Sequence, residues 1–177
     1  IGTLEADEES AAFAVSDVTG IYLDQTHGDD ANDGLTKDKA VQTIAKANAL
    51  ADANGTSDIF LTSVYQVTGT EIWNIGGKTI HRYTGGYMIE LKDASASLTL
   101  QNVVIDGAKY SVAAENAAET DSIIKAANGG TIELKSGAIL ENNKAAQFGS
   151  GILANNGVKI TMEDGAVIRN NTNRNYE

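Results

Sequence analysis

The most constraining feature of this sequence is an internal repeat in its last third. A shift of 28 residues lays residues 122–149 over residues 150–177, and ten of the 28 aligned pairs are identical. A repeat of this length indicates that one small structural unit is stacked on the next, so that neighbouring units bury a continuous core. The Gly and Asn identities are Asn128/Asn156, Gly129/Gly157, Gly137/Gly165, Asn142/Asn170 and Asn143/Asn171.

The repeated unit consists of short strands. Residues 131–135 and 159–163 alternate apolar and polar side chains, which is the pattern of a half-buried strand. Each is followed by a turn and a second short apolar run, and the three- and four-residue spacing of apolar positions on a helix is missing. The repeat therefore predicts an all-β fold, a parallel β-solenoid in which each strand pairs with its equivalent about 4.8 Å away in the next coil.

Weaker copies of the unit lie upstream. Residues 98–107 match the same pattern with one residue deleted, and residues 58–82 supply another set of strand-like runs. We expect about four coils, the second longer by a loop, and we expect the natural protein to continue past residue 177; a second subunit covering the open end is the alternative. The expected coils are residues 58–86, 87–121, 122–149 and 150–177.

Charged and amide side chains fit the stacking of one unit on the next. The 28-residue shift places Lys135 beside Glu163 and Glu141 beside Arg169, so that opposite charges face each other across neighbouring strands. The paired Asn residues fall in turns, where Asn tolerates a positive φ and its amide can bond to the equivalent amide of the next coil. The sequence thus predicts the register of the strands.

Residues 20–57 differ from the repeat and are expected to close one end of it. A strand at residues 21–24 leads through a polar loop to an amphipathic helix over residues 38–53, which Asn54 and Gly55 end. The open end of a solenoid exposes apolar core and unpaired strand edges. We therefore expect the helix to act as an N-terminal cap.

This entry segment resembles a known group of proteins. The runs "YLDQTHGDDANDGLTKDKAVQTIAKANALA" and "DIFLTSVYQVTG" are similar to the N-terminal entry of the pectate-lyase-like, right-handed parallel β-helix superfamily. The coil ends "GAILENN" and "GAVIRNN" resemble repeats of exported surface proteins of Gram-positive gut bacteria. The resemblance covers about residues 20–177 and implies a right-handed β-helix; the superfamily includes polysaccharide lyases, glycoside hydrolases, phage tailspikes and adhesins.

Charge and composition exclude several classes of function. The chain carries 13 basic and 24 acidic residues, a formal net charge of −11, and nine of the acids lie in the first 36 residues with no Lys or Arg. Residues 1–19 are interpreted as an acidic N-terminal arm. Such a chain is a poor candidate for binding nucleic acid, and no stretch is apolar enough to span a membrane. With no Cys, it has neither disulfides nor Cys-ligated zinc.

An acidic loop is the candidate metal site. It carries several oxygen-bearing side chains of the kind that bind Ca²⁺, although the spacing does not fit the 12-residue EF-hand loop. The alternative is that the same side chains form turns and cap the helix that follows. The candidate calcium ligands are Asp24, Asp29, Asp30, Asn32 and Asp33.

The sequence contains no assignable catalytic set. A glycosidase needs two carboxyl groups roughly 5 to 9.5 Å apart, and the outward candidates Glu141 and Glu163 already face opposite charges. A lyase would need a base such as Lys or Arg, but His81 and Arg82 are adjacent in a strand and point to opposite faces. The further outward candidates are Glu71, Glu90, Asp93, Asp106 and Glu133, and His81 is interpreted as a surface or turn residue.

Aromatic side chains are the candidate ligand contacts, because their rings stack on sugars. Phe148 and Tyr176 are one repeat apart, so they stack either outward, where they would bind a glycan, or inward, where they would fill a corner of a coil. The candidate ligand-binding residues are Trp73, Tyr83, Tyr87, Phe148 and Tyr176.

These observations favour a non-catalytic, extracellular domain of a bacterial surface protein. It would act as an adhesin or rigid stalk and bind a host or cell-wall glycan or protein. Two alternatives stay open: a carbohydrate-active lyase or hydrolase, or its N-terminal fragment, and a subunit that assembles head to tail.

Overall fold

A computed structural model describes residues 20–109, 121–145 and 149–173. Almost all of its regular structure is β-strand, and every pair of neighbouring strands is parallel. The elements are β1 (Ile21–Leu23), η1 (Lys37–Lys39), α1 (Ile44–Asn54), β2 (Asp58–Leu61), β3 (Tyr65–Val67), β4 (Thr70–Arg82), β5 (Ile89–Leu91), β6 (Ser97–Lys109), β7 (Ile124–Ala126), β8 (Thr131–Leu134), β9 (Ala138–Glu141), β10 (Lys144–Ala145), β11 (Ile152–Ala154), β12 (Lys159–Met162), β13 (Val167–Arg169) and β14 (Thr172–Asn173).

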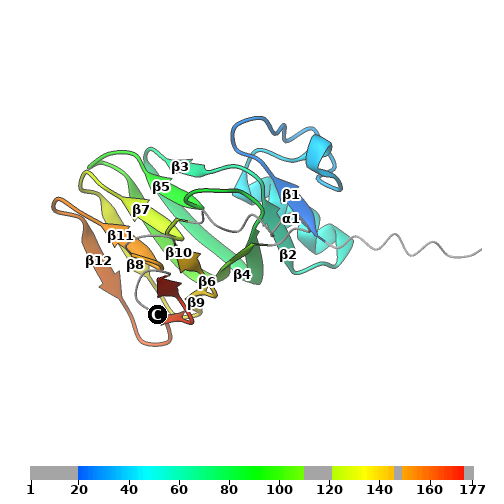
Figure 1. Ribbon diagram of the computed structural model, residues 1–177. Helices are drawn as coiled ribbons and strands as arrows, with labels where there is room; N and C mark the ends of the chain where they lie inside the picture. The colour runs from blue at the N-terminus through cyan, green and yellow to red at the C-terminus, as the bar shows by residue number, and fades with distance from the viewer. Residues whose placement is uncertain (1–19, 110–120, 146–148, 174–177) are drawn as a thin grey trace, which may run out of the picture.

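The strands form sheets that the chain visits in turn. The largest sheet has the order β1-β2-β4-β6-β8-β12, with β9 beside β6 and β13 beside β9, and a second sheet has the order β11-β7-β5-β3. From β2 to β8 the chain alternates between these two sheets, and both sheets run from the α1 end of the molecule to the β12 end (Figure 1). This all-β, parallel arrangement is consistent with a β-helix-like solenoid.

The 28-residue repeat sets the strand register as predicted. Ile124 lies opposite Ile152, Ile132 opposite Ile160 and Ile139 opposite Val167. The predicted ion pairs are present, with Lys135 Nζ 3.4 Å from Glu163 Oε1, and Arg169 Nε donating to Glu141 Oε2 at 2.6 Å.

The Asn turns also follow the prediction. Asn142 and Asn170 have φ values of 58° and 54°, and Asn170 Nδ2 donates to Asn142 Oδ1 at 3.3 Å. The left-handed conformation costs Asn less than most residues because its short amide can bond locally. One layer upstream, Asn102 repeats the arrangement at φ 45°, with its Nδ2 donating to Asn74 Oδ1 at 3.2 Å.

The helix begins later than the sequence predicted. Thr43 caps it by accepting a hydrogen bond from the Lys46 N–H at 3.2 Å, and Gly55 ends it in the left-handed conformation at φ 66°. The expected first turn, from residue 38, is instead a short 3₁₀ segment and an extended stretch in which Val41 bridges to Leu23. That backbone pairing with β1 buries Val41 and excludes a helical start there.

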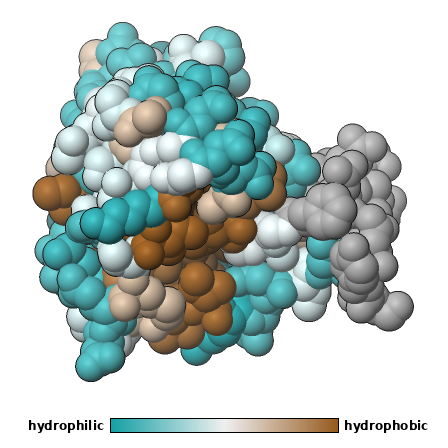
Figure 2. Space-filling model, turned by 90° about the vertical axis from the view of Figure 1, so that its left-hand side faces the viewer, coloured by the Kyte–Doolittle hydropathy of each residue, from teal (hydrophilic) through white to brown (hydrophobic). Residues whose placement is uncertain are grey.

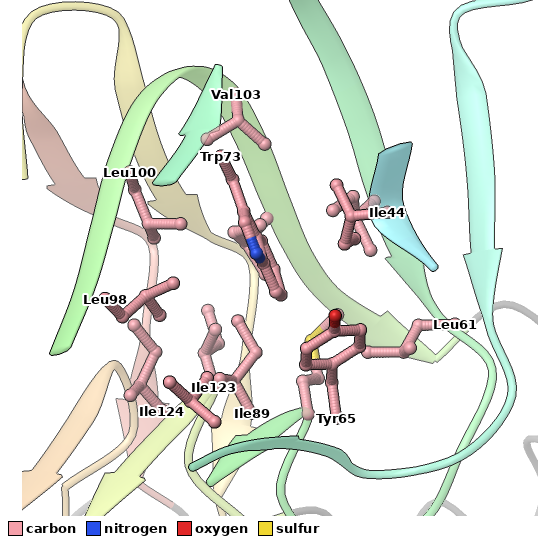
Figure 3. Close-up of a cluster of buried hydrophobic side chains, with 14 of the residues drawn as sticks. Ile44, Leu61, Tyr65, Trp73, Ile89, Leu98, Leu100, Val103, Ile123 and Ile124 are labelled. Carbon is pink, nitrogen blue, oxygen red and sulfur yellow. The ribbon is translucent and has the colours of Figure 1, made fainter. Parts of the chain in front are cut away.

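The core consists of inward-facing columns of side chains, one from each layer of strands. Leu98, Ile132, Leu100 and Leu134 are all at most 1% exposed. Figure 3 shows Trp73 in the middle of this cluster, with Leu98 and Leu100 on one side and Ile44 and Tyr65 on the other.

The single α-helix of the described part of the chain is too short and too polar to cross a membrane.

Candidate functional site

The acidic loop uses its carboxylates to hold its own backbone. Asp24 Oδ1 accepts hydrogen bonds from the N–H groups of Thr26 at 2.9 Å and His27 at 3.0 Å. Asp30 accepts from the Thr43 hydroxyl at 2.7 Å and from the Thr43 N–H at 3.0 Å, which fixes the loop to the N-terminus of α1. Burial opposes the charge of Asp30, but these bonds outweigh it and lower the pKa of the carboxyl.

The other candidate calcium ligands make turns as well. Asp29 Oδ1 accepts from the Ala31 N–H at 2.9 Å and Asp33 Oδ1 from the Leu35 N–H at 3.0 Å, while Asn32 donates to the Ala40 carbonyl at 3.0 Å. Within the described ranges, no three His, Asp or Glu side chains are grouped as a metal site. The geometry supports the turn-forming alternative, and calcium binding stays a prediction.

The three aromatic candidates that the structure describes lie in different surroundings. Trp73 is only 2% exposed, so its ring is not free to stack on a sugar, which corrects that expectation; a tryptophan buries more area inside the core than any other side chain. Tyr83 packs edge-on against Tyr22 at 5.8 Å, and Tyr87 lies under Lys125 Nζ at 4.6 Å. Phe148 and Tyr176 lie outside the described residues.

A cleft opens where α1 meets the first layer of strands. Its volume is about 410 Å³, within the range of small-molecule sites. Polar and aromatic side chains converge on it from α1, β3 and β4. The lining residues are Thr43, Ile44, Ala45, Asn48, Tyr65, Glu71, Ile72, Trp73, Asn74 and Ile75.

Glu71 occupies an inward position in this cleft. In the pairing of β4 with β6 it lies opposite Leu98, which lies opposite Ile132 in β8. Those two residues are fully buried core, so Glu71 is a carboxylate at a register that other layers fill with aliphatic side chains. The expectation that Glu71 points outward is therefore wrong, because β4 continues the inward alternation of β6.

Neighbouring aromatic groups hold the Glu71 carboxylate. The indole Nε1 of Trp73 donates to Glu71 Oε2 at 2.8 Å, and the rings of Trp73 and Tyr65 meet edge to face at 4.9 Å. Burial, together with the negative charge of Glu71, raises the pKa of Tyr65 above its usual value, so its hydroxyl stays protonated. The floor of the cleft is thus a carboxylate fixed between two aromatic side chains.

An acceptor in the wall of the cleft has no partner. Asn48 Oδ1 is buried and makes no hydrogen bond to any described residue. A buried acceptor left unpaired costs about 1–3 kcal/mol, so such atoms usually have a ligand or a water. Asn48 and Glu71 together present two acceptors to a molecule that carries hydrogen-bond donors.

No protein-family model matches this chain, and no curated protein or solved structure matches it. Its likeness to the pectate-lyase-like superfamily therefore rests on the motifs of the sequence.

The sequence contains one signal that predicts the cleft, namely a charged residue at an otherwise apolar strand position. Residues 70–74, 97–101 and 131–135 align as one strand position after another, and Glu71 then falls in the column of Leu98 and Ile132. A charged residue in an otherwise aliphatic column breaks the pattern that core packing imposes, and such exceptions are expected at functional sites.

The sequence analysis did not predict a second polar cluster, a histidine held between two carboxylates. His81 is 13% exposed and lies between two carboxylates on neighbouring strands, with Nε2 2.6 Å from Asp58 Oδ1 and Nδ1 3.2 Å from Asp106 Oδ2. The sequence interpretation placed His81 at the surface or in a turn; it lies on the outward face of β4 and not in a turn, opposite Asp106 of β6 and diagonal to Asp58 of β2, which pairs with Thr79. Burial disfavours the charged imidazole, but both carboxylates bond to it and raise the pKa of His81.

The cluster of Asp58, His81 and Asp106 predicts that the stability of the folded protein depends on pH. The raised pKa of His81 adds stability below about pH 6.5, its ordinary value, and that stability disappears as the pH rises through the higher folded value. Asp106 has a lowered pKa, so its contribution is present above about 3.8 and is lost as the pH falls. We expect the melting temperature to drop by about 2–4 °C between pH 6 and pH 8, which corresponds to about 1 kcal/mol.

Thermal unfolding followed by circular dichroism measures this drop. His81→Gln should remove most of it, whereas His27→Gln, which changes a histidine with a 79% exposed side chain, should leave it in place. If the melting temperature of His81→Gln depended on pH as that of the wild type does, the cluster would not contribute to stability.

Proposed function

We propose that this chain is a right-handed parallel β-helix domain of about four coils, of the pectate-lyase-like type, from an exported bacterial surface protein. It is a non-catalytic adhesive or spacer domain at the cell surface. Parallel strands in register, joined by Asn and ion-pair contacts between layers, support the spacer role because each layer is fixed to the next by backbone hydrogen bonds.

Adhesion takes place in the cleft between α1 and β4, and its ligand is a neutral glycan. The observation that carries this proposal is Glu71, a carboxylate at an aliphatic core position that opens onto a 410 Å³ cleft. Sugar hydroxyls donate hydrogen bonds, and Glu71 and Asn48 offer acceptors. A glycan with acidic groups would be repelled by Glu71 and by the net charge of −11.

The same cleft argues against hydrolysis. A glycosidase places two carboxyl groups on either side of the bond that breaks. Glu71 is the one carboxylate among the described residues that line the cleft. A carbohydrate-active lyase or hydrolase is therefore the weaker alternative.

Calorimetric titration with neutral and acidic oligosaccharides tests the proposal. We expect a neutral oligosaccharide to bind, and Glu71→Gln to weaken it by about ten- to a hundredfold, the value of a hydrogen bond to a charged group. Glu133→Gln makes the same change at the outward position of β8 and should leave the affinity unaltered. Glu71→Leu should keep the fold, because Leu98 occupies this register in β6.

Three outcomes would contradict the proposal. The first is the absence of binding across the neutral panel, and the second is binding that survives Glu71→Gln unchanged. The third is the appearance of cleavage products by mass spectrometry that vanish in Glu71→Gln, since this would make the cleft an active site.

A further inference from the structure

The cleft between α1 and β4 reverses the polarity of two neighbouring columns of side chains. Glu71 lies in an inward column that continues with the buried Leu98 in β6. The adjacent outward column continues with Thr99 in β6 and Glu133 in β8, whereas its member in β4 is Ile72. β4 therefore has an acid where the next layer is aliphatic, and an aliphatic side chain where the next layers are polar. Because core packing explains neither residue, the two indicate a ligand that has both polar and apolar groups.

Ile72 offers the apolar contact of the cleft. It is 67% exposed, more than any other large apolar side chain among the described residues. The aromatic side chains of the cleft, Tyr65 and Trp73, are at most 6% exposed, so a sugar ring cannot stack flat on them. Figure 2 looks onto the opposite, β12 end of the molecule and shows an apolar area with polar residues around it. The exposed apolar residues of β12 and β13 are Ile160, Met162 and Ile168. Since Ile72 lies away from that end, its exposure belongs to the cleft, and the matching group of a ligand is small and aliphatic.

The first half of β4 is an open edge of the large sheet. β4 lies between β2 and β6, but β2 pairs only with residues 79–82, so residues 70–74 have a described strand on one side alone. The Ser97 N–H donates to the Gly69 carbonyl at 2.9 Å. Because backbone groups alternate in direction along a strand, the N–H and C=O groups of Ile72 point away from β6. They therefore lie on the side of β4 that borders the cleft.

The opposite wall of the cleft supplies an acceptor. Asn48 of α1 has a buried side-chain oxygen that makes no hydrogen bond to a described residue. The terminal torsion of an Asn side chain is soft, so this oxygen can turn towards a donor in the cleft. One wall thus offers the Ile72 N–H and the other offers Asn48 Oδ1. A trans secondary amide has its C=O and N–H on opposite sides, so a single amide group can bond to both walls.

We propose that the glycan bound in this cleft carries an acetamido group, as N-acetylated amino sugars do. The acetamido carbonyl accepts a hydrogen bond from the Ile72 N–H, and the acetamido N–H donates to Asn48 Oδ1. The methyl group packs on the side chain of Ile72, and the sugar hydroxyls donate to Glu71. An acetamido group is uncharged, so the ligand remains neutral. This inference rests on the proposed binding of a neutral glycan at Glu71.

Calorimetric titration with matched pairs of oligosaccharides is the test. The two members of a pair share the sugar ring and the linkage, and they differ only in an acetamido group or a hydroxyl on one carbon. Oligomers of N-acetylglucosamine are compared with those of glucose, and oligomers of N-acetylgalactosamine with those of galactose. We expect the acetamido member of at least one pair to bind about ten- to thirtyfold more tightly, the value of one hydrogen bond and one buried methyl group. The deacetylated oligomer, which carries a free amine, should lose this advantage.

Two variants separate the contacts of the acetamido group. Ile72→Ala should reduce the preference within a pair to about threefold, because the methyl group loses its contact. Ile168→Ala makes the same change at an exposed position of β13, at the other end of the molecule, and should leave the preference unaltered. Asn48→Ala should weaken the acetamido member about fivefold or more. Asn54→Ala, the same change in the last residue of α1, should not. Melting curves check that every variant is folded.

Amide hydrogen exchange tests the predicted backbone contact. The Ile72 N–H should exchange freely in the unliganded protein and at least about tenfold more slowly when the acetamido oligomer is bound, while the Trp73 N–H, which points towards β6, is slow in both.

The outcomes distinguish this inference from the proposal beneath it. Equal affinities within every pair, with binding still dependent on Glu71, would overturn the acetamido inference alone. A preference that persists in Ile72→Ala, or tighter binding of the free amine, would overturn it as well. Absence of binding by every oligosaccharide would overturn both.

Discussion

Replacing Arg82 with alanine is expected to lower the free energy of unfolding by about 4 kcal/mol, because buried acceptors would lose their donor. The guanidinium group is fully buried. Its Nε donates to the Gly107 carbonyl at 3.0 Å, and its terminal nitrogens donate to the carbonyls of Gly86 and Asp121 and to Asn143 Oδ1. These acceptors come from segments far apart in the chain.

The guanidinium group of Arg82 stays positively charged although it is buried. Burial lowers the pKa of Arg82 to about 10, against the attraction of Asp121 and Asp106, so the group is protonated at neutral pH. A protonated guanidinium can satisfy several carbonyls at once through its fixed fork of donors. Arg82→Lys keeps a charge but loses the fork, and it should cost a smaller part of the same energy.

Urea unfolding followed by far-ultraviolet circular dichroism measures both variants. Arg169→Ala is the matched control, since its side chain is 54% exposed and bonds to Glu141 alone among the described residues. We expect that control to cost less than about 1 kcal/mol, as exposed ion pairs do. A loss no larger for Arg82→Ala than for Arg169→Ala would show that the buried network is not stabilising.

Trp73→Ala is expected to cost about 3–5 kcal/mol, the usual loss for removing a buried aromatic side chain. Trp73 is 2% exposed and packs in the middle of the core cluster (Figure 3). The variant would leave a cavity and would also remove the indole donor from Glu71. Part of the loss should therefore disappear in a background that carries Glu71→Leu.

The neighbouring residue provides the control for Trp73. Ile72 is 67% exposed on the opposite face of β4, so Ile72→Ala should change the free energy of unfolding by less than about 0.5 kcal/mol. Thermal and urea unfolding compare the two. Equal costs would mean that the ring does not pack as the structure shows.

The parallel pairing of the C-terminal strands was predictable from the sequence because the 28-residue repeat is regular in that part of the chain. Between residues 122 and 173, strands, turns and ion pairs all share one offset, so a single alignment gives Lys135 beside Glu163 and Asn142 beside Asn170. Alternation then decides which side chains face inward.

The candidate site was harder to predict because the upstream layers are irregular. Ile59 pairs with Ile80 and Ile80 with Ile105 at spacings that differ from each other and from 28 residues. An alignment at a fixed offset therefore places neither His81 between its two carboxylates nor Glu71 in its aliphatic column. The late start of α1 was missed for another reason, since the pairing of Val41 with Leu23 is a tertiary contact.

The shared offset also constrains how such a chain can change in length. Strand register, the left-handed Asn turns and the Glu141–Arg169 pair all recur at 28 residues. An insertion within a strand would move apolar side chains out of their columns and separate the paired charges, whereas the upstream layers keep their columns at spacings other than 28 residues. In the regular part of the chain, duplication or loss of a whole unit preserves every pairing at once and changes the reach by about 4.8 Å.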